Sequence, residues 1–596
     1  MPLLAQADGI TAVVERWLDE FRRVLGAHGN TALGALFQAD SYWRDVLALT
    51  WRIRTVRGRE HLVPELKARA VEARVAAIAI DRERTAPREV TRAGAKAIEA
   101  ILRFETAAGR CSGVLRLTRD AADDRPKAWT LFTTLDELKG FEERVGRLRP
   151  GGHSYSREFR GPNWLDLRKS DAAYANREPA VLIVGGGHAG LSLAARLRQL
   201  GVDALVIDRW PRVGDNWRRR YHALTLHNQV HVNHLPYLHF PPNWPVYIPK
   251  DKIAGWLESY VEAMELNYWT GTEFLGGSYD AASARWSVAL RRADGGRRTL
   301  YPRHVVLATG VSGIPNLPDI PTLADFRGKM VHSHGYDDGE AWAGKRALVL
   351  GTGNSGHDIA QDLHSGGASV TLVQRGSTHI VNLEPSAQLP YALYDEGPPL
   401  EDCDLIAASM PFALARRSHE LLTARAKELD RELLEALARV GFELDDGDAG
   451  AGWQFKYLTR GGGYYFNVGC SDLVASGAIR LVQFADIERF EPEGARLRSG
   501  ELLRADLVVL ATGYKGQEAL VGRLFGAEVA ARVGPIWGFD EGQELRNMYV
   551  RTAHPGLWFI AGSFAQCRIY SRCLALQIKA QEEGLLPQGE GLLALA

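Results

Sequence analysis

The sequence predicts an α/β protein, because two distant segments carry the same order of strand, glycine-rich turn and helix. The first joins an apolar run at residues 180–184 to a GxGxxG turn at residues 185–190, and the second joins residues 347–350 to residues 351–356. Residues 1–150 contain no such turn and mix helical with short strand-like patterns. We therefore expect two similar α/β units preceded by a separate α+β domain.

The first glycine turn has the residue types that a dinucleotide pyrophosphate site requires. Gly185 permits the tight turn, Gly187 lets the backbone approach the phosphates, and Gly190 allows close packing of helix on strand. His188 and Ala189 lie between the last two glycines and belong to the same predicted site. The turn therefore predicts a Rossmann-like dinucleotide-binding domain.

The strand pattern after this helix, at residues 204–207, ends in Asp208. A carboxylate at this position accepts hydrogen bonds from an adenosine ribose. The first unit is therefore expected to bind FAD or NAD.

The second glycine turn repeats this arrangement. Gly351, Gly353 and Gly356 have the spacing of the first set, and Asn354 and Ser355 stand where the helix begins. A single turn of this kind can serve packing alone, but two in order favour two bound dinucleotides.

The second unit differs from the first in the charge that follows its second strand. The strand pattern at residues 369–374 is followed by Arg375 instead of an acid. A guanidinium binds the 2′-phosphate of NADPH, which a carboxylate would repel. We therefore assign NADPH to the second unit and FAD to the first, because a flavin must receive the hydride.

Composition sets the class of protein. The 596 residues include 72 Lys and Arg and 72 Asp and Glu, so a formal net charge of zero gives no support for nucleic-acid binding. The five cysteines form no CxxC pair, which favours a reducing cytoplasm over a disulfide framework. The first residues do not combine a positively charged start with an apolar core, and no apolar run approaches the roughly 20 residues of a membrane span, so we expect neither secretion nor a membrane partner.

The first 150 residues carry an amphipathic helix pattern near residues 11–25 and strand patterns at residues 113–117 and 128–132. With the phrase at residues 49–58, this order resembles the cone-shaped NTF2-like (SnoaL-like) domain. The resemblance implies an enzyme, a ligand pocket or a dimerising module, and it leaves open a homodimer formed through this domain.

Two acids near Trp43 give this domain two interpretations. Asp40 and Asp45 could form a proton-transfer site. We favour instead an aromatic core with solvated acids, in a domain that serves interaction or covers a site.

Two strand patterns mark where the chain passes between the two nucleotide-binding units. Residues 305–310 end in Ala-Thr-Gly, and residues 507–514 carry the same three residues, Ala511, Thr512 and Gly513, before Tyr514. Small residues let the backbone pass close to a cofactor.

These crossings divide the chain into five segments. We expect the NTF2-like domain at residues 1–150, a linker at 151–175, the first part of the FAD domain at 176–335, the NADPH domain with a helical insert at 336–500, and the second part of the FAD domain at 501–596.

Residues 326–336 read Phe-Arg-Gly-Lys-Met-Val-His-Ser-His-Gly-Tyr, which matches the FxGxxxHxxxY/F signature of flavin-containing monooxygenases. With the paired turns, it makes the chain resemble the class B flavoprotein monooxygenases over roughly residues 175–590. Related Baeyer–Villiger enzymes carry Trp where this chain has Tyr336. Residues 221–227 are similar to a phrase of the YUCCA-like branch, so the heteroatom-oxidising and YUCCA-like branches are favoured.

The resemblance implies an oxidoreductase that uses FAD, NADPH and O2, and the cysteine content predicts a cytoplasmic one. NADPH would reduce the flavin, which would add oxygen at C4a as a (hydro)peroxyflavin and oxygenate a small organic substrate. N-oxidation, S-oxidation and YUCCA-like oxidative decarboxylation of a 2-oxo acid stay open. The alternatives are a Baeyer–Villiger monooxygenase, an NADPH-dependent flavin reductase or oxidase, and a non-catalytic nucleotide-binding scaffold.

The same resemblance assigns roles at the reaction site. Asn228 aligns with the family asparagine near the reactive edge of the flavin, where an amide donates and accepts hydrogen bonds without titrating. The alternative is a turn asparagine, with His227 or Asn233 as the true counterpart. His332 and Tyr336 would link the cofactor domains.

Trp217 and two arginines complete the expected site. Trp217 would cover part of the flavin or belong to an interdomain core, and His227 would lie beside the cofactor. Arg568 or Arg572 could meet a substrate anion, although either is more often a solvated charge. A charged helix near residues 415–437 is expected to cap the NADPH domain.

Overall fold

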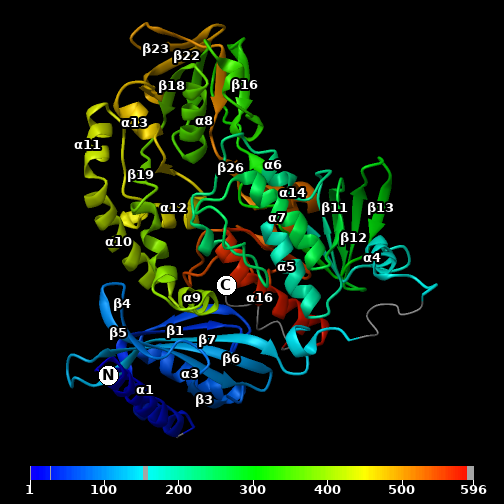
Figure 1. Cartoon of the computed structure of the whole chain (residues 1–596), viewed down its shortest axis with the longest axis vertical. Helices are drawn as coiled ribbons and strands as arrows, with labels where there is room; N and C mark the ends of the chain where they lie inside the picture. The colour runs from blue at the N-terminus through cyan, green and yellow to red at the C-terminus, as the bar shows by residue number, and fades with distance from the viewer. Residues whose placement is uncertain (1, 27–28, 152–158, 587–596) are drawn as a thin grey trace.

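A computed structural model describes residues 2–26, 29–151 and 159–586 of the chain. The N-terminal domain forms one end of the molecule, one parallel sheet lies in the middle, and a second parallel sheet forms the opposite end (Figure 1). The two parallel sheets confirm the expectation of an α/β protein with Rossmann-type units.

The N-terminal domain is a seven-stranded sheet with helices on one face. The strands run in the order β2-β1-β7-β6-β5-β3, with β4 paired to β5, and only β1 and β7 are parallel neighbours. Helices α1 and α3 pack on this sheet, and α9 and α16 lie on its other side (Figure 1). Its elements are α1 (Pro2–Leu25), α2 (Thr31–Gly34), β1 (Phe37–Val46), β2 (Ile53–Arg57), α3 (Arg59–Glu72), β3 (Ala76–Ile80), β4 (Arg88–Arg92), β5 (Ala95–Glu105), β6 (Gly109–Arg119) and β7 (Pro126–Leu138).

One of the two acids in this domain is not solvated. Asp40 is exposed, as expected, but Asp45 is fully buried and accepts hydrogen bonds from the hydroxyls of Thr50 and Thr133, both at 2.6 Å. Burial raises the pKa of Asp45 to about 6. The expectation of a solvated Asp45 is therefore wrong, because the side chain closes the turn after β1.

The first Rossmann unit is a parallel sheet in the order β10-β9-β8-β14-β27. Helix α16 packs along α5 beside this sheet. Its elements are α4 (Trp164–Ala173), β8 (Val181–Val184), α5 (His188–Gln199), β9 (Ala204–Ile207), α6 (Asp215–Arg218), α7 (Lys250–Ala263), β10 (Asn267–Trp269), β14 (His304–Leu307), α14 (Gln517–Phe525), α15 (Ala527–Val533), β27 (Leu557–Phe559), α16 (Phe564–Glu582) and an antiparallel sheet of β11 (Glu273–Asp280), β12 (Arg285–Arg291) and β13 (Arg297–Leu300).

The second Rossmann unit is a parallel sheet in the order β16-β25-β17-β18-β21. Its elements are β16 (Lys329–His332), β17 (Arg346–Leu350), α8 (Asn354–Ser365), β18 (Ser369–Gln374), α13 (Cys470–Ala475), β21 (Arg480–Gln483), β25 (Leu507–Leu510) and an antiparallel sheet of β22 (Ile487–Glu491), β23 (Gly494–Leu497) and β24 (Leu502–Arg504).

The predicted boundaries of this unit are wrong at both ends. Strand β16 lies before residue 336, and β25 lies after residue 500, yet both pair within the second sheet. A short apolar strand next to a boundary fits either sheet equally well, and only the pairing decides. The predicted linker at 151–175 lies partly outside the described residues, and α4 occupies its end.

An insert between β18 and β21 connects the second unit to the N-terminal domain (Figure 1). The charged stretch predicted as one helix forms α10 and α11, and α10 packs on a 3₁₀ helix, η7, and on α12. The elements of the insert are β19 (His379–Asn382), η7 (Ser386–Asp395), α9 (Leu400–Ala408), α10 (Phe412–Leu429), α11 (Arg431–Arg439), α12 (Gly452–Arg460) and β20 (Tyr464–Asn467).

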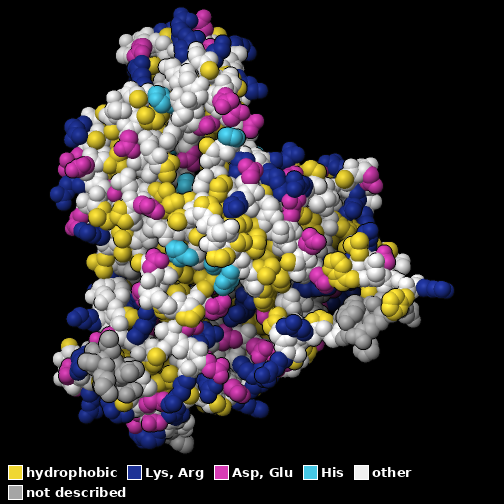
Figure 2. Space-filling model, viewed as in Figure 1, with side chains coloured by type: hydrophobic (Ala, Val, Ile, Leu, Met, Phe, Trp, Pro, Cys, Tyr) yellow, Lys and Arg dark blue, Asp and Glu magenta, His cyan; other side chains and the backbone are white. Residues whose placement is uncertain are grey.

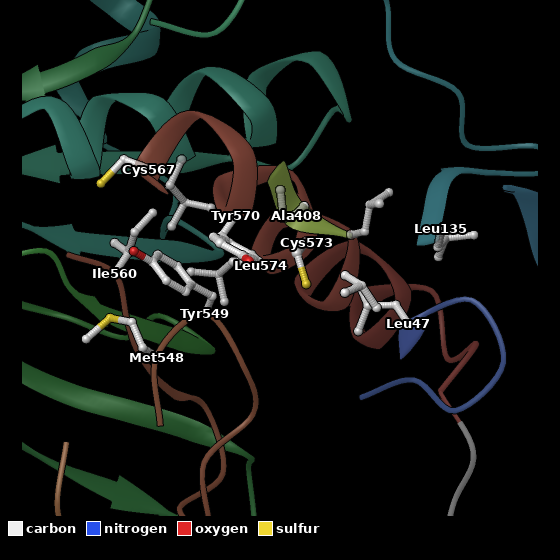
Figure 3. Packing of buried hydrophobic residues seen from close by; sticks show 14 of the residues in the cluster. Leu47, Leu135, Ala408, Met548, Tyr549, Ile560, Cys567, Tyr570, Cys573 and Leu574 are labelled. Carbon is white, nitrogen blue, oxygen red and sulfur yellow. The ribbon is translucent and has the colours of Figure 1, made fainter. Parts of the chain in front are cut away.

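The hydrophobic core continues from the N-terminal domain into the first Rossmann unit. Leu47 and Leu135 of the N-terminal sheet belong to the same buried cluster as Tyr549, Cys573 and Leu574 (Figure 3). The two parts therefore share one core rather than being joined only by a linker.

Two surface properties bear on partners. Basic and acidic side chains are interspersed over the face seen in Figure 2, in agreement with the net charge of zero. Within the described part of the chain, no helix is long and apolar enough to span a bilayer.

Candidate active site

The first glycine turn leaves no room for side chains at two positions. Gly185 has a φ of +113°, and a Cβ there would lie 2.5 Å from the carbonyl oxygen of Ala308. A Cβ at Gly190 would lie 2.1 Å from the carbonyl oxygen of Gly185. These contacts hold α5 close to β8, so the N-terminus of the helix points at the turn.

Backbone donors surround this turn. Gly187 precedes α5 in an extended conformation, and no side chain caps the helix. The carboxylate of Asp208 accepts hydrogen bonds from the N–H groups of Gly186 at 2.8 Å and Trp210 at 3.0 Å. Burial raises the pKa of Asp208. The free donors of α5 suit a phosphate, and Asp208 lies beside them.

Aromatic rings lie at the same helix terminus. The ring of His188 stacks on Phe564 with centroids 4.1 Å apart, and Trp217 lies 5.9 Å from Phe564. The Nε2 atom of His188 is 2.9 Å from the carbonyl oxygen of Gly562, in the turn before α16. This turn was missed in the sequence, although the apolar strand ending in Gly-Ser at residues 557–563 resembles the other strand ends.

Two buried donors near this site have no protein acceptor. Nε1 of Trp217 and Oγ1 of Thr309, at the end of β14, are both buried without a hydrogen-bond partner among the described residues. Unpaired buried donors are costly unless a ligand satisfies them. The residues present therefore fit a cofactor that carries hydrogen-bond acceptors.

The second glycine turn has nearly the same geometry. Gly351 has a φ of +116°, with its would-be Cβ 2.3 Å from the carbonyl oxygen of Ala511, and a Cβ at Gly356 would lie 2.0 Å from that of Gly351. Gly353 precedes α8 without a capping side chain. Asn354 accepts a hydrogen bond from the backbone N–H of Phe466 at 3.1 Å, and Ser355 follows in the first turn of the helix.

The strand register shows which residue of the second unit corresponds to Asp208. Val184 pairs with Ile207 in the first sheet, and Leu350 pairs with Val373 in the second. The residue after Val373 is Gln374, so Arg375 lies one position further along than sequence reasoning placed it.

Gln374 and Arg375 have different environments. The Gln374 amide is fully buried and bonds both backbone groups of Glu443, at 2.8 Å and 2.9 Å. Arg375 is exposed, and no hydrogen bond or ion pair joins it to another residue that the structure describes. Its guanidinium is available to an anionic ligand.

The two chain crossings between the Rossmann units lie side by side. Strands β15 (Ile314–Pro315) and β26 (Tyr514–Lys515) pair antiparallel. The hydroxyl of Thr512 donates to the carbonyl oxygen of Asn316 at 2.7 Å, and the N–H of Asn316 donates to that of Gly513 at 3.0 Å. The crossings thus form a two-stranded connection between the units.

His332 and Tyr336 both lie in the second unit but differ in position. Nε2 of His332 lies 3.1 Å from the carbonyl oxygen of Gly513 at the crossing, and burial lowers the pKa of the ring. Tyr336 is buried, and its hydroxyl donates to Asp362 on α8 at 2.7 Å. His332 therefore contacts the connection between units, whereas Tyr336 anchors the loop after β16 to α8.

Asn228 lies where the first unit meets the insert of the second. Its side-chain amide donates to the hydroxyl of Tyr391, on η7, at 2.8 Å. Asn233 supports the same loop by donating to the carbonyl oxygen of Asn228 at 2.9 Å. Gln388, also on η7, donates to the carbonyl oxygen of His227 at 2.9 Å. No sequence pattern indicated Tyr391 or Gln388, because their partners lie far away in the chain.

Neither arginine expected to meet a substrate anion is a free solvated charge. Arg568 is buried and bonds both carboxylate oxygens of Asp404 at 2.7 Å. It also donates to the carbonyl oxygens of Val232 and His234, both at 2.8 Å. Arg572 lies 3.5 Å from Asp136. The expectation is wrong for Arg568, which joins α9 to α16.

Comparison with known proteins places these features in a family. The model of the family described as "Pyridine nucleotide-disulphide oxidoreductase" matches residues 182–392. Indole-3-pyruvate monooxygenase YUCCA1 of Oryza sativa subsp. japonica is 33% identical over 343 residues, which are 56% of this chain and 77% of the relative. The chain belongs to the YUCCA family of flavin monooxygenases. It is a flavin-containing monooxygenase and therefore an oxidoreductase.

Other YUCCA proteins match over a similar length. The probable indole-3-pyruvate monooxygenase YUCCA1 of Arabidopsis thaliana is 30% identical over 339 residues, 56% of this chain and 75% of the relative. Among solved structures, a flavin-containing monooxygenase from Stenotrophomonas maltophilia is 20% identical and covers 67% of this chain and 98% of its own, with a TM-score of 0.46.

The cysteines of this YUCCA-family enzyme are not arranged for disulfide chemistry. All five are buried free thiols. Burial raises the pKa of Cys567, Cys573 and Cys470 far above the usual value, which suppresses the reactive thiolate. The matching family model therefore describes the nucleotide-binding architecture here, not a dithiol centre.

Proposed function

We propose that this YUCCA-family enzyme binds FAD at the first glycine turn and NADPH at the second, and uses O2 to oxygenate a small organic molecule between them. The observation that carries the proposal is the pair of nearly identical glycine turns, linked through the paired crossings β15 and β26. Two helix N-termini without side-chain caps suit two pyrophosphates.

FAD is bound by the first unit. The turn from Gly185 to Gly190, with His188 and Ala189, receives the pyrophosphate, and Asp208 accepts hydrogen bonds from the ribose. The unpaired donor of Trp217 then finds an acceptor on the cofactor. A flavin held by these residues would supply two-electron redox chemistry between a nicotinamide and oxygen.

NADPH is bound by the second unit. Gly351, Gly353 and Ser355 receive its pyrophosphate at the start of α8, and Arg375 binds the 2′-phosphate. His332 holds the connection to the first unit at Gly513, and thereby helps to fix the distance between the two cofactors.

Asn228 and Tyr391 form the polar part of the reaction site. The Asn228 amide donates to the Tyr391 hydroxyl, so the oxygen of Asn228 is left to accept and the hydroxyl proton of Tyr391 to donate. Burial raises the pKa of Tyr391, so it stays protonated at neutral pH. The rings of Trp453, Tyr464 and Phe466 pack near Tyr391 and exclude water.

The buried aromatic rings packed beside Tyr391 suit a planar aromatic substrate. The relatives are named indole-3-pyruvate monooxygenases, so an aromatic 2-oxo acid is the first candidate. Its oxidative decarboxylation places one oxygen atom in the product carboxyl group, reduces the other to water and releases CO2, while NADPH supplies two electrons. N- and S-oxidation are the alternatives.

The N-terminal domain is proposed to be NTF2-like, with the sheet order and the two covering helices as support. The homodimer stays a prediction, and it must use a surface other than the sheet face that α9 and α16 cover. The five free thiols suit the cytoplasm, and the net charge of zero suits a small-molecule partner rather than nucleic acid.

The test is anaerobic reduction followed by turnover. The purified yellow protein should be bleached by NADPH without oxygen, and should convert indole-3-pyruvate, amines or sulfides with product formed per NADPH. Bleaching by NADPH with all oxygen recovered as hydrogen peroxide, for every substrate, would contradict the proposal and indicate an oxidase. A colourless protein that does not retain added FAD would indicate a scaffold.

A further inference from the structure

The N-terminal domain binds the C-terminal end of α9 in the insert. Arg116 donates to the carbonyl oxygen of Ile406 at 3.3 Å and to the Ser409 hydroxyl at 2.8 Å, and Arg44 donates to the carbonyl oxygen of Ala408. The last carbonyls of a helix lack partners within it and carry partial negative charge, which cations satisfy.

The same domain binds the other end of α9. Asp402, in the first turn, accepts hydrogen bonds from the backbone N–H and the hydroxyl of Thr85 at 2.8 Å and 2.5 Å. Glu396, just before the helix, pairs with Arg88 at 2.8 Å and Arg92 at 2.7 Å. The segment from Glu396 to Ser409 is therefore held at both ends.

The cations that hold α9 are fixed in turn. Arg116 is fully buried and bonds Glu99 at 2.9 Å. Arg44 is buried and bonds both carboxylate oxygens of Glu544 in the first Rossmann unit, at 2.8 Å and 2.7 Å. Arg116 is thus fixed within its own domain, whereas Arg44 also joins this domain to the first Rossmann unit. Loss of either carboxylate would leave an uncompensated buried cation.

The held segment is continuous with the helix that carries the reaction-site tyrosine. Helix η7 ends at Asp395, next to Glu396. Tyr394 of η7 donates to Asp404 of α9 at 2.8 Å, and Arg568 bonds the same carboxylate. The position of Tyr391 on η7 is thus coupled to the position of α9.

We propose that the N-terminal domain is a positioning element of the oxygenation site: by holding Glu396 and Asp402 it keeps Tyr391 of η7 hydrogen-bonded to Asn228. This inference rests on the proposed function, because the Asn228 and Tyr391 pair is the reaction site only in a monooxygenase. When these contacts are broken, η7 moves away from Asn228 and water enters the reaction site. The oxygen is then released as hydrogen peroxide instead of being transferred to the substrate.

The test combines two neutral substitutions in the full-length protein, Glu396→Gln and Asp402→Asn. Each removes a charge at the interface without changing the size of the side chain. The matched control is Glu420→Gln, on an exposed part of α10 in the same insert with no ion pair to another described residue. If the pair of substitutions impairs folding, Thr85→Val alone removes one hydroxyl donor to Asp402.

Two readouts are measured on each variant. Hydrogen exchange of peptides covering residues 386–395 should be about tenfold faster than in the wild type, since local opening sets the exchange rate. Hydrogen peroxide formed per NADPH should rise by a similar factor, while bound flavin and its anaerobic reduction by NADPH stay unchanged. The control should match the wild type in both.

Tyr391→Phe gives a further readout. Combined with the interface substitutions, it should add no further peroxide, because both changes remove the same hydrogen bond. Fully additive peroxide formation would overturn the proposal.

Faster exchange with unchanged peroxide, or unchanged exchange, would also overturn the proposal. Failure of the proposed function shows separately in the wild type, either as a flavin that NADPH does not reduce without oxygen or as complete recovery of oxygen as hydrogen peroxide with every substrate.

Discussion

Gln374 of the second Rossmann unit occupies the strand-end position that Asp208 occupies in the first. Asp208 offers a carboxylate beside the glycine turn, whereas the Gln374 amide is neutral and bonded to the backbone of Glu443. Arg375, the next residue, is exposed and unpaired within the described part of the chain, and we propose that it supplies the charge that selects NADPH.

Replacing Arg375 tests this arrangement. Arg375→Ala should raise the KM for NADPH by about 10- to 100-fold, because a charge-assisted bond to the 2′-phosphate is lost. The KM for NADH, which lacks this phosphate, should change little. Steady-state kinetics with NADPH and with NADH measure both KM values. An equal rise in KM for the two nucleotides would refute the role of Arg375.

Asn228→Ala tests the reaction site. The variant should keep FAD and should still be reduced by NADPH, but product should fall at least about tenfold while hydrogen peroxide rises, since the site loses its fixed amide. Product and peroxide are quantified per NADPH consumed. Asn233→Ala is measured alongside, because Asn233 bonds the backbone of the same loop. An unchanged product yield in Asn228→Ala would refute the role assigned to the Asn228 amide.

The glycine turns predict a sharp difference between two similar substitutions. Gly190→Ala should lower the melting temperature and abolish FAD retention, because the new Cβ would lie 2.1 Å from a carbonyl oxygen. The control is Gly255→Ala in α7, where a Cβ meets nothing within 4 Å. That change should be neutral or add about 0.5–1 kcal/mol of stability. Thermal denaturation and flavin absorbance compare the two, and equal behaviour would contradict the packing described here.

The raised pKa of the buried Asp45 carboxyl predicts that the stability of the protein depends on pH. Burial raises this pKa to about 6 in the folded protein from the ordinary value of 3.8, so the folded state binds this proton more tightly. Stability from this group therefore increases as pH falls from about 7 towards 4, by on the order of 2–3 kcal/mol.

Asp45→Asn cannot titrate and should lose this contribution. The melting-temperature difference between wild type and variant should accordingly grow in favour of the wild type between pH 7 and pH 5. A difference that is constant over this range would show that Asp45 is already protonated or unperturbed.

The sequence was sufficient for features that depend on neighbours along the chain. The turns at Gly185 and Gly351 follow from local backbone requirements, and their spacing is visible without a structure. The one-residue offset between Asp208 and Arg375 required the strand register. The strands β16 and β25 were assigned to the wrong side of the boundaries because local pattern does not say which sheet a strand joins.

The site residues that sequence reasoning missed are those fixed by long-range packing. The role proposed for Tyr391 follows only from its hydrogen bond to Asn228, which lies in another domain. The sequence suggested that Arg568 is a free cation, because its partner Asp404 lies far away in the chain, on the insert. Burial of Asp45 likewise depends on the sheet and helices closing around it. The roles of Asn228, His332 and Tyr336 stay predictions.

The interface around α9 also has an evolutionary consequence. Glu396 and Asp402 on one side, and Arg92, Arg88 and Thr85 on the other, are complementary partners encoded in distant parts of the gene. Exchange of the N-terminal domain alone by recombination would leave the buried carboxylate of Asp402 without its Thr85 donors and would leave Glu396 without its arginine partners. We therefore expect the two halves to be inherited together, with substitutions on one side accompanied by compensating substitutions on the other.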